Sequence, residues 1–503
     1  MTIEQIRGRN VPPTGPYDTL RDYLAALNAR GRLLHIERMD QDAFEGTGFA
    51  YRLIDEFGIN KAPTFVIDEI KIDGKWIKGP VVCNLFGGWD TEAMGLGVEE
   101  ITDDYEQMYR AAIDKLIGMT DENGKWQRIK PINVKKEKAP CKEVILTGDD
   151  VDITSFPFLQ CNPADGGRYI NSGSMIFQDR ELGRNVGTYR CHIKSARKVM
   201  INPEVGQHGW NFLMQAKKRG EATVNVAVVL GLDPITYTLS STKLATMGED
   251  EFELAGGLKG KPIELVPCET SDIMVPADAE MVIEGEVPLD ERDDEGPHGE
   301  MFGYLGGKHD ANFFMNIKAI THRKDRILVN NFPGAMRGFY TSLPEANAFL
   351  TYKKLIYNLV GYHSPAHLTG VTVVSIDKNL ATEGISAGQH VAAHNRFSKI
   401  TIVVDKDINI YNFEEVMHAV ATRWQPYPAS LIIPRARGPL LDPSAATRGI
   451  ISKIVIDATR QFPEEGGPKE FAAASRTLLS EMAPNVFDLV ERNWPDYWKH
   501  WQK

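Results

Sequence analysis

The stretch DDEGPHGEMFG, residues 293–303, places two carboxylates, Glu295 and Glu300, five residues apart. The glycines and the proline between them exclude a regular helix and favour a turn. A turn can bring two carboxylates to one place, where different surroundings let one act as an acid and the other as a base. Two solvated acids in a loop would have the same spacing, so on these residues alone both interpretations stay open.

A second stretch, GRNVGTYRCH at residues 183–192, combines three useful side chains. Asn185 is an amide that can bind a metal, Arg190 is a fixed cation, and His192 is an imidazole. An arginine beside a carboxylate lowers the carboxylate pKa and holds its orientation. Taken singly, each of these residues could equally occupy a surface or a turn.

A third group consists of His208, in GQHGW, and the acid-rich segment GEDEFE at residues 248–253. A lone histidine is more often structural than a ligand, and an acidic run is usually a solvated turn. The functional alternative is that one of these acids, together with an asparagine and a histidine, binds a divalent cation. Such mixed nitrogen and oxygen ligands suit Mn²⁺ or Fe²⁺ better than a structural zinc.

Composition and missing motifs exclude several classes. The 503 residues carry a net charge of −11, which disfavours broad binding to nucleic acid or anionic membranes. No glycine-rich dinucleotide motif, P-loop or G-x-S-x-G lies between a predicted strand and helix. Five cysteines without a C-x-x-C pair, no secretory signal, and no apolar run near 20 residues predict a cytoplasmic protein that does not span a membrane.

The hydrophobic pattern divides the chain into regions of different texture. Residues 18–30 predict a helix and 32–38 a strand, which indicates an N-terminal α/β domain over 1–140 that ends in a lysine-rich connector. Short strand-like runs separated by turn residues predict a sheet-rich, barrel-like domain over 141–330.

The remainder of the chain alternates helical and strand patterns. It predicts a second α/β domain over 331–480, with a helix over 345–359. The tail, residues 481–503, predicts an amphipathic helix carrying Trp494, Trp498 and Trp501. These aromatic side chains either pack on their own chain or form a dimer contact.

Taken in order, these segments resemble the UbiD family of decarboxylases, which use prenylated flavin mononucleotide (prFMN). The resemblance spans nearly the whole chain, and its most specific part is the EGPxGE element together with the Asn-x4-Arg element. It implies that the central domain is a split, flavin-reductase-like β-barrel that holds the cofactor. The matching segments are 18–38, DGGRYI at 165–170, 185–190, Gln207-His208, EGPHGE at 295–300, ATR at 421–423, IVIDAT at 454–459 and the C-terminal helix.

The resemblance also implies roles for single residues. Arg190, Glu295 and Glu300 match the family's catalytic network, with Glu300 as proton donor. Asn185, His208 and Glu251 match its ligands for a divalent metal, usually Mn²⁺ but also Fe²⁺ or Mg²⁺, which bridges to the cofactor phosphate with K⁺ nearby. Glu251 is preferred to Glu249 and Glu253 because its interval to Glu300 matches the family's. The implied cofactor contacts are Asn185, Val186, Gly187, Thr188, Tyr189, Arg190, Gln207, His208, Glu251 and Lys399.

Two features bear on the substrate pocket. His298 stands where an apolar residue is common in the family, so the pocket's polarity is open. The segment 330–343 contains Phe332, Met336, Phe339 and Tyr340, which suit a planar ring, and Arg337, which could meet a second anionic group or be a surface charge.

The expected activity is reversible, non-oxidative decarboxylation of an aromatic or heteroaromatic acid, free or as a CoA thioester. No amino-acid side chain can accept the electrons left when such a carbon loses CO₂, so a cofactor must do so. We expect a separate flavin prenyltransferase to supply it, and a homodimer or larger homo-oligomer. The alternatives are a non-catalytic subunit of a multi-subunit carboxylase and a metal-dependent hydrolase that needs no flavin.

Overall fold

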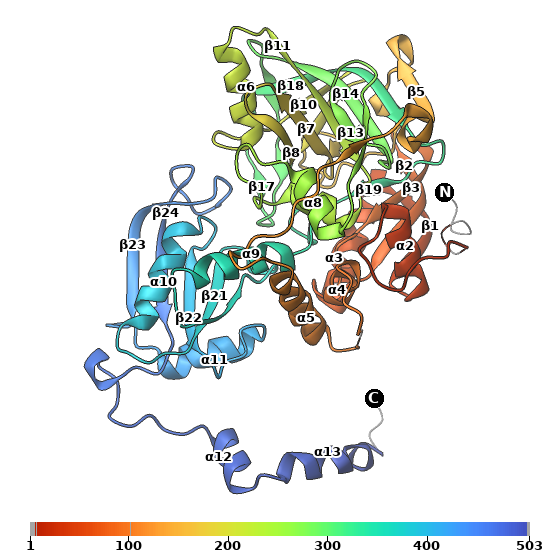
Figure 1. The fold of residues 1–503 in the computed structure, drawn as a ribbon. Helices are drawn as coiled ribbons and strands as arrows, with labels where there is room; N and C mark the ends of the chain where they lie inside the picture. The colour runs from red at the N-terminus through yellow and green to blue at the C-terminus, as the bar shows by residue number, and fades with distance from the viewer. Residues whose placement is uncertain (1–5, 7, 101, 500–503) are drawn as a thin grey trace.

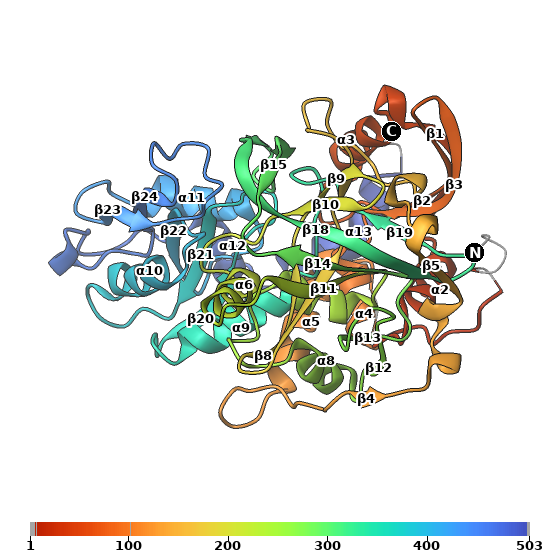
Figure 2. The same ribbon diagram turned by 90° about the horizontal axis from the view of Figure 1, so that it is seen from above.

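The protein has mixed α/β architecture built around several separate sheets. The computed structural model describes residues 6, 8–100 and 102–499. Seen from above, the N-terminal and C-terminal sheets lie on opposite sides of a large central sheet (Figure 2). The predicted α/β multidomain organisation is therefore confirmed. In the described residues no helix is long and apolar enough to cross a membrane.

The N-terminal region begins with helix α2 (Leu20–Ala29), which packs against a four-stranded sheet (Figure 1). The helix starts at Thr19, whose side chain accepts the N–H of Asp22 in a capping box. It ends before Gly31, whose φ of 70° suits glycine. The strand order is β1-β2-β3-β19, so a strand from far along the chain completes this sheet. The elements are β1 (Leu33–Asp40), β2 (Thr64–Ile72), β3 (Lys75–Cys83), β19 (Leu328–Asn330), α3 (Glu45–Phe57), α4 (Trp89–Gly95) and α5 (Tyr105–Gly118).

The central sheet has ten strands, all paired antiparallel, in the main order β6-β9-β10-β18-β14-β11-β7-β8, with β5 and β15 paired to β18. Because β6 and β8 do not pair in the described chain, the path is open and forms no closed barrel. The strands are β5 (Val144–Thr147), β6 (Tyr169–Ile170), β7 (Ser174–Asp179), β8 (Gly183–Thr188), β9 (Cys191–Ser195), β10 (Lys198–Ile201), β11 (Thr223–Leu230), β14 (Met281–Pro288), β15 (Asp293–Glu295) and β18 (His309–His322).

Three helices and two small sheets accompany the central sheet. They are α6 (His208–Lys218), α7 (Pro234–Ser241) and α8 (Glu251–Lys259), the sheet of β4 (Ile132–Asn133), β12 (Glu264–Pro267) and β13 (Met274–Pro276), and the pair β16 (His298–Gly299) and β17 (Leu305–Gly306).

The C-terminal region contains a five-stranded sheet of order β20-β21-β22-β24-β23. The predicted helix over 345–359 is wrong at its C-terminal end, because α9 stops at Lys353 and Leu359 begins β20. Asn358, which lies beyond the end of this helix, donates to the Asp377 carbonyl and to Glu383. The elements are α9 (Ser342–Lys353), β20 (Leu359–His363), β21 (Val371–Ile376), α10 (Glu383–His394), β22 (Ile400–Asp405), α11 (Phe413–Arg423), β23 (Ser430–Arg437) and β24 (Ile450–Asp457).

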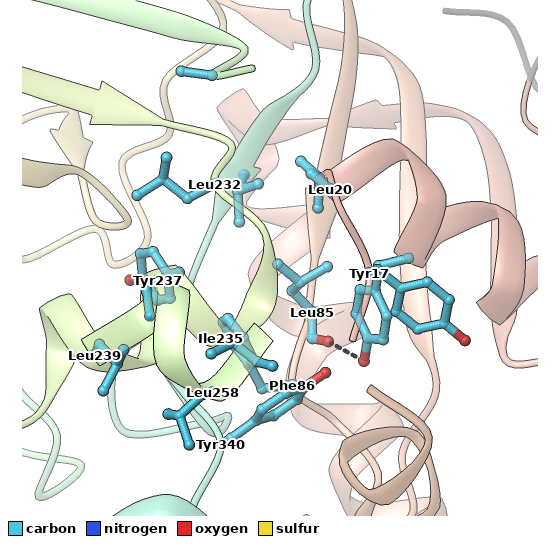
Figure 3. Close-up of a cluster of buried hydrophobic side chains, with 14 of the residues drawn as sticks. Tyr17, Leu20, Leu85, Phe86, Leu232, Ile235, Tyr237, Leu239, Leu258 and Tyr340 are labelled. Atoms are coloured by element: carbon cyan, nitrogen blue, oxygen red, sulfur yellow. Dashed lines mark hydrogen bonds between the residues drawn. The ribbon is translucent and has the colours of Figure 1, made fainter. Parts of the chain in front are cut away.

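One hydrophobic core joins the N-terminal region to the helices beside the central sheet. Figure 3 shows Leu20 and Leu85 of the N-terminal region facing Leu232 and Ile235, in a buried cluster that also contains Phe86 and Tyr237. The Phe86 and Tyr237 rings stack at a centroid distance of 5.3 Å. These regions therefore pack as one body.

The chain ends in two helices, α12 (Ser475–Met482) and α13 (Val486–Tyr497), which lie away from the body in Figure 1. No residue of these two described helices is buried. The predicted tail helix is thus present, while Trp501 lies outside the described residues.

Candidate active site

A single arginine joins the two carboxylates of the 293–303 turn. Arg190 follows β8, and its Nε and Nη2 donate to the two oxygens of Glu295 at 2.9 and 2.7 Å. Its Nη1 donates to Glu300. Gly296, with a φ of 89°, makes the turn between the two acids possible. The turn thus brings both carboxylates to Arg190.

The two acids differ in their surroundings. Burial raises the pKa of Glu300, while Arg190 opposes that shift. Glu295 is fully buried and binds Arg190 through both oxygens, which fixes the orientation of the two side chains. Burial alone would lower the pKa of Arg190, yet its hydrogen bonds to Glu295 raise it. Glu300 is therefore the acid better suited to carry and give a proton.

A group of aromatic rings packs against Glu295 of this network. The Tyr169 hydroxyl donates to Glu295 at 3.3 Å, and its ring lies over His192 and His298 at centroid distances of 4.6 and 4.2 Å. His298 is buried and interacts with Asn171 at 3.0 Å through Nε2. Burial lowers the pKa of His298 to about 3, so its imidazole is neutral. His298 thus adds a polar but uncharged group.

A second polar group lies where β8 meets the start of α8. The side-chain nitrogen of Asn185 donates to Glu251 Oε1 at 3.1 Å, and the Val186 N–H donates to Oε2 at 2.9 Å. Burial raises the pKa of Glu251 to about 7. The side-chain oxygen of Asn185 is buried and has no partner in the described structure. A bound cation would give the Asn185 oxygen a partner and would balance the charge of the buried Glu251 carboxylate.

His208 is the first residue of α6, directly after the N-cap Gln207. The next residue, Gly209, donates its N–H to the Tyr189 hydroxyl at 2.9 Å, which ties the start of α6 to the end of β8. Burial lowers the pKa of His208, which leaves its ring neutral and able to bind a metal. Within residues 6, 8–100 and 102–499, no three His, Cys, Asp or Glu side chains are grouped as a metal site.

The other predicted cofactor contacts occupy β8 and its surroundings. Thr188 lies within hydrogen-bonding distance of the hydroxyls of Ser240 and Ser241, at 3.0 and 2.9 Å. A side chain at Gly187 would meet the Tyr189 ring at 2.7 Å, so glycine is required there. Residues 185–190 therefore form a continuous edge that contacts Glu251 at its first residue and Glu295 at its last.

Lys399 directly precedes β22 and lies apart from these contacts. Its Nζ binds Asp442 at 2.9 Å and also donates to Ser444. The C-terminal region contacts the site through a different residue. Arg448 forms an ion pair with Glu204 at 2.6 Å, and Glu204 lies shortly before His208 in the sequence.

A small pocket opens beside Glu300. Phe332, which the sequence assigned to the pocket, lines it, whereas Tyr340 is fully buried in the core. Arg337 is also buried and pairs with Glu92 at 2.8 Å rather than facing a ligand. Pro333 and Ala335, from the same segment 330–343, also line it. The sequence did not assign the other lining residues to the pocket, since they come from α3, from the strands β16 and β17 and from separate loops: Thr47, Tyr51, Cys161, Asn162, Asp165, Gly299, Gly303, Tyr304 and Leu305.

Comparison with known proteins places this geometry in a family. Residues 132–336 match the model of the 3-octaprenyl-4-hydroxybenzoate carboxy-lyase Rift-related domain, and residues 340–458 match that enzyme's C-terminal domain. A phenolic acid decarboxylase of Bacillus subtilis is 29% identical over 95% of this chain and all of its own.

Two solved structures share the whole fold. An evolved dimeric form of the UbiD-class enzyme HmfF from Pelotomaculum thermopropionicum, in complex with prFMN, is 26% identical with a TM-score of 0.74, covering 91% of this chain and 97% of that chain. The open form of vanillic acid decarboxylase from Sedimentibacter hydroxybenzoicus is 26% identical with a TM-score of 0.76, covering 95% and 99%. Since the two domain models together match well over half of the residues, the chain belongs to the UbiD family of carboxy-lyases.

Proposed function

We propose that the protein is a prFMN-dependent, non-oxidative decarboxylase of an aromatic or heteroaromatic carboxylic acid. The observation that carries this proposal is the arrangement of one arginine, Arg190, between Glu295 and Glu300. Relatives named for phenolic and vanillic acids support an aromatic substrate. The free acid and its CoA thioester are both compatible with the proposal, and so is carboxylation at high CO₂.

The side chains divide the chemistry between them. When bound, prFMN supplies the electron sink that no side chain offers. Glu300 gives a proton to the carbon that has lost CO₂, and its raised pKa keeps the acid form available. Arg190 orients Glu300, while Glu295 fixes Arg190 through two hydrogen bonds.

The cofactor would lie along the edge formed by residues 185–190, with Gln207 and His208 beside it. Asn185, His208 and Glu251 would hold a divalent cation, for which we expect Mn²⁺, with K⁺ nearby. The unpaired oxygen of Asn185 and the buried carboxylate of Glu251 support this assignment. Lys399 would reach the cofactor only if it left Asp442.

We further propose three segments that cooperate: an N-terminal α/β domain over 1–140, a split-barrel cofactor domain over 141–330, and a C-terminal α/β domain over 331–480. The tail over 481–503 would contact a second copy in a homodimer or larger oligomer. Its exposed apolar side chains, including Phe487 and Trp494, support this, as does a dimeric relative. A cytoplasmic location remains a prediction that the five free, buried cysteines fit.

Two other functions are less well supported. A non-catalytic subunit has no need for the Arg190 network, which is complete here. A metal-dependent hydrolase would use His208 and nearby acids, and it predicts activity without any flavin.

The decisive experiment is co-expression with a flavin prenyltransferase, followed by visible spectroscopy and mass spectrometry of the released cofactor. We expect a flavin-like spectrum, the mass of prFMN, and CO₂ release from at least one acid in an aromatic panel. Protein made without the prenyltransferase is the control and should be inactive. Colourless protein after co-expression, or substrate turnover without cofactor, would refute the proposal.

A further inference from the structure

The turn that carries Glu300 is held by a second turn from a distant part of the chain. Asp165 accepts the Gly299 N–H on Oδ1 at 2.8 Å, and the neighbouring Gly166 N–H donates to the Pro297 carbonyl at 2.8 Å. Gly299 directly precedes Glu300. The two hydrogen bonds therefore attach the backbone beside the proton donor to residues 165–166.

Asp165 has little freedom to move. Its other oxygen, Oδ2, accepts the Asn162 N–H at 2.9 Å, and its own N–H donates to the Asn162 carbonyl at 2.9 Å. The Gln160 side chain donates to the Asp165 carbonyl at 3.1 Å. Only 7% of Asp165 is exposed. A buried carboxylate with both oxygens bonded to backbone is a rigid support.

The two turns also touch without intervening side chains. A Cβ atom at Gly166 would lie 2.4 Å from the Gly296 carbonyl oxygen, so only glycine allows this approach. Asp165 and Glu300 line the same cavity. A shift of Asp165 or Gly166 would therefore move the backbone of residues 296–299, which directly precedes Glu300.

We propose that Asp165 is a positioning residue for proton transfer, which fixes Gly299 and thereby aims Glu300. This inference rests on the proposed function, in which Glu300 is the proton donor. Without the Asp165 carboxylate, the Gly299 N–H loses its acceptor and the turn loosens. Arg190 keeps both of its bonds to Glu295, so the cofactor side of the site is unaffected. The loss should fall on kcat rather than on KM.

The kinetic test uses the holoenzyme and three substitutions at one position. Asp165→Ala should lower kcat about 100-fold, with KM and prFMN content changed less than about twofold. Asp165→Leu fills the space of the Asp165 side chain but offers no acceptor to the Gly299 N–H, so it should lower kcat in the same way. It provides the same test if the alanine variant fails to fold. Asp165→Asn keeps an oxygen that can accept from Gly299 and should recover much of the lost rate. Asp310→Ala, an exposed acid on β18, is the matched control and should retain wild-type kcat.

A double variant shows whether Asp165 acts through Glu300. Adding Asp165→Ala to Glu300→Gln should cause no further loss of residual rate, since residues that act as one unit are not additive. A full additional 100-fold loss would overturn the proposal, because Asp165 would then act independently.

A readout that does not depend on activity is amide hydrogen exchange measured by mass spectrometry. Peptides that include Gly299 should exchange faster in Asp165→Ala than in wild type, and Asp165→Asn should restore protection. The positioning role would be overturned if the Gly299 peptides of Asp165→Ala exchanged at the wild-type rate. It would also be overturned if Asp165→Ala holoenzyme kept the kcat of an active wild-type holoenzyme. Wild-type holoenzyme that releases no CO₂ from any acid would instead refute the proposed function.

Discussion

Asn185 donates its side-chain N–H to Glu251 at 3.1 Å, and this contact leaves the other end of the Asn185 amide, a buried oxygen, with no partner in the described chain. A buried acceptor without a donor costs about 1–3 kcal/mol. Burial also raises the pKa of Glu251 to about 7. Both penalties disappear if a cation binds between the two side chains, which makes this pair the centre of the proposed metal site.

Replacing Glu251 with glutamine should abolish metal retention and reduce prFMN content with it, because the site loses its only negative ligand. Elemental analysis and visible absorbance of the purified protein measure both quantities. Glu249→Gln is the control, since Glu249 is partly exposed and pairs with Arg128, and it should keep both. Full metal content in Glu251→Gln would remove Glu251 from the site.

Replacing Glu300 with glutamine should lower kcat by about 10²–10⁴-fold while prFMN and metal stay bound, because only the transferable proton is lost. Stopped-flow decarboxylation assays and the flavin spectrum provide the two readouts. A variant that turns over at nearly the parent rate would show that another group gives the proton.

His298 should make the protein sensitive to acid. Burial against Tyr169 and His192, near Arg190, lowers the pKa of His298 to about 3, whereas the unfolded chain binds a proton near pH 6.5. The stabilising contribution is therefore complete above about pH 6.5 and is lost as pH falls toward 3, by up to about 1.4 kcal/mol per pH unit.

His298→Phe should move the acid-unfolding midpoint, followed by circular dichroism, to lower pH. The matched control is His418→Phe, at an exposed position on α11, which should leave the midpoint in place. An unchanged midpoint in His298→Phe would mean that other groups, such as the buried His192, control acid unfolding.

Arg337 should contribute to stability rather than to substrate choice. Its side chain and that of Glu92 are almost completely buried, so Arg337→Ala leaves the Glu92 carboxylate without a counter-charge at a cost of about 3–5 kcal/mol. Urea unfolding should detect this loss, while Arg38→Ala, from an exposed pair with Glu69, should cost less than about 1 kcal/mol. A change in substrate preference at normal stability would contradict this assignment.

Deleting residues 475–503 should reduce the oligomeric state without unfolding the body. The tail helices α12 and α13 bury none of their described residues, and Leu479, Met482 and Phe487 are exposed. Light scattering after size exclusion measures the mass, and circular dichroism checks the fold. A truncated protein with the parent's mass would place the contact elsewhere.

Local patterns in the sequence accounted for much of the site. The glycine-rich turn singled out Glu295 and Glu300, and the family resemblance joined them to Arg190, which the structure brings into contact with both. The choice of Glu251 over Glu249 also agrees with burial, since Glu251 is 5% exposed and bonded to Asn185.

Contacts between distant segments could not be predicted from the sequence. Asp165 meets Gly299, and Arg337 meets Glu92, across stretches with no common periodicity. The strand order of the central sheet could not be predicted either. Two strands, β9 and β10, separate β6 from β18, and this order depends on packing and not on the pattern of any one strand.

The pairing of β19 with β3 has a consequence for synthesis on the ribosome. Val81–Cys83 at the edge of the N-terminal sheet finds its partner, Leu328–Asn330, only after about 240 more residues have been translated. At roughly 5–20 residues per second this takes about 12–50 seconds, during which β3 presents an unpaired apolar edge. The nascent N-terminal region therefore depends on the completion of the central sheet, and fragments that end before residue 328 should aggregate.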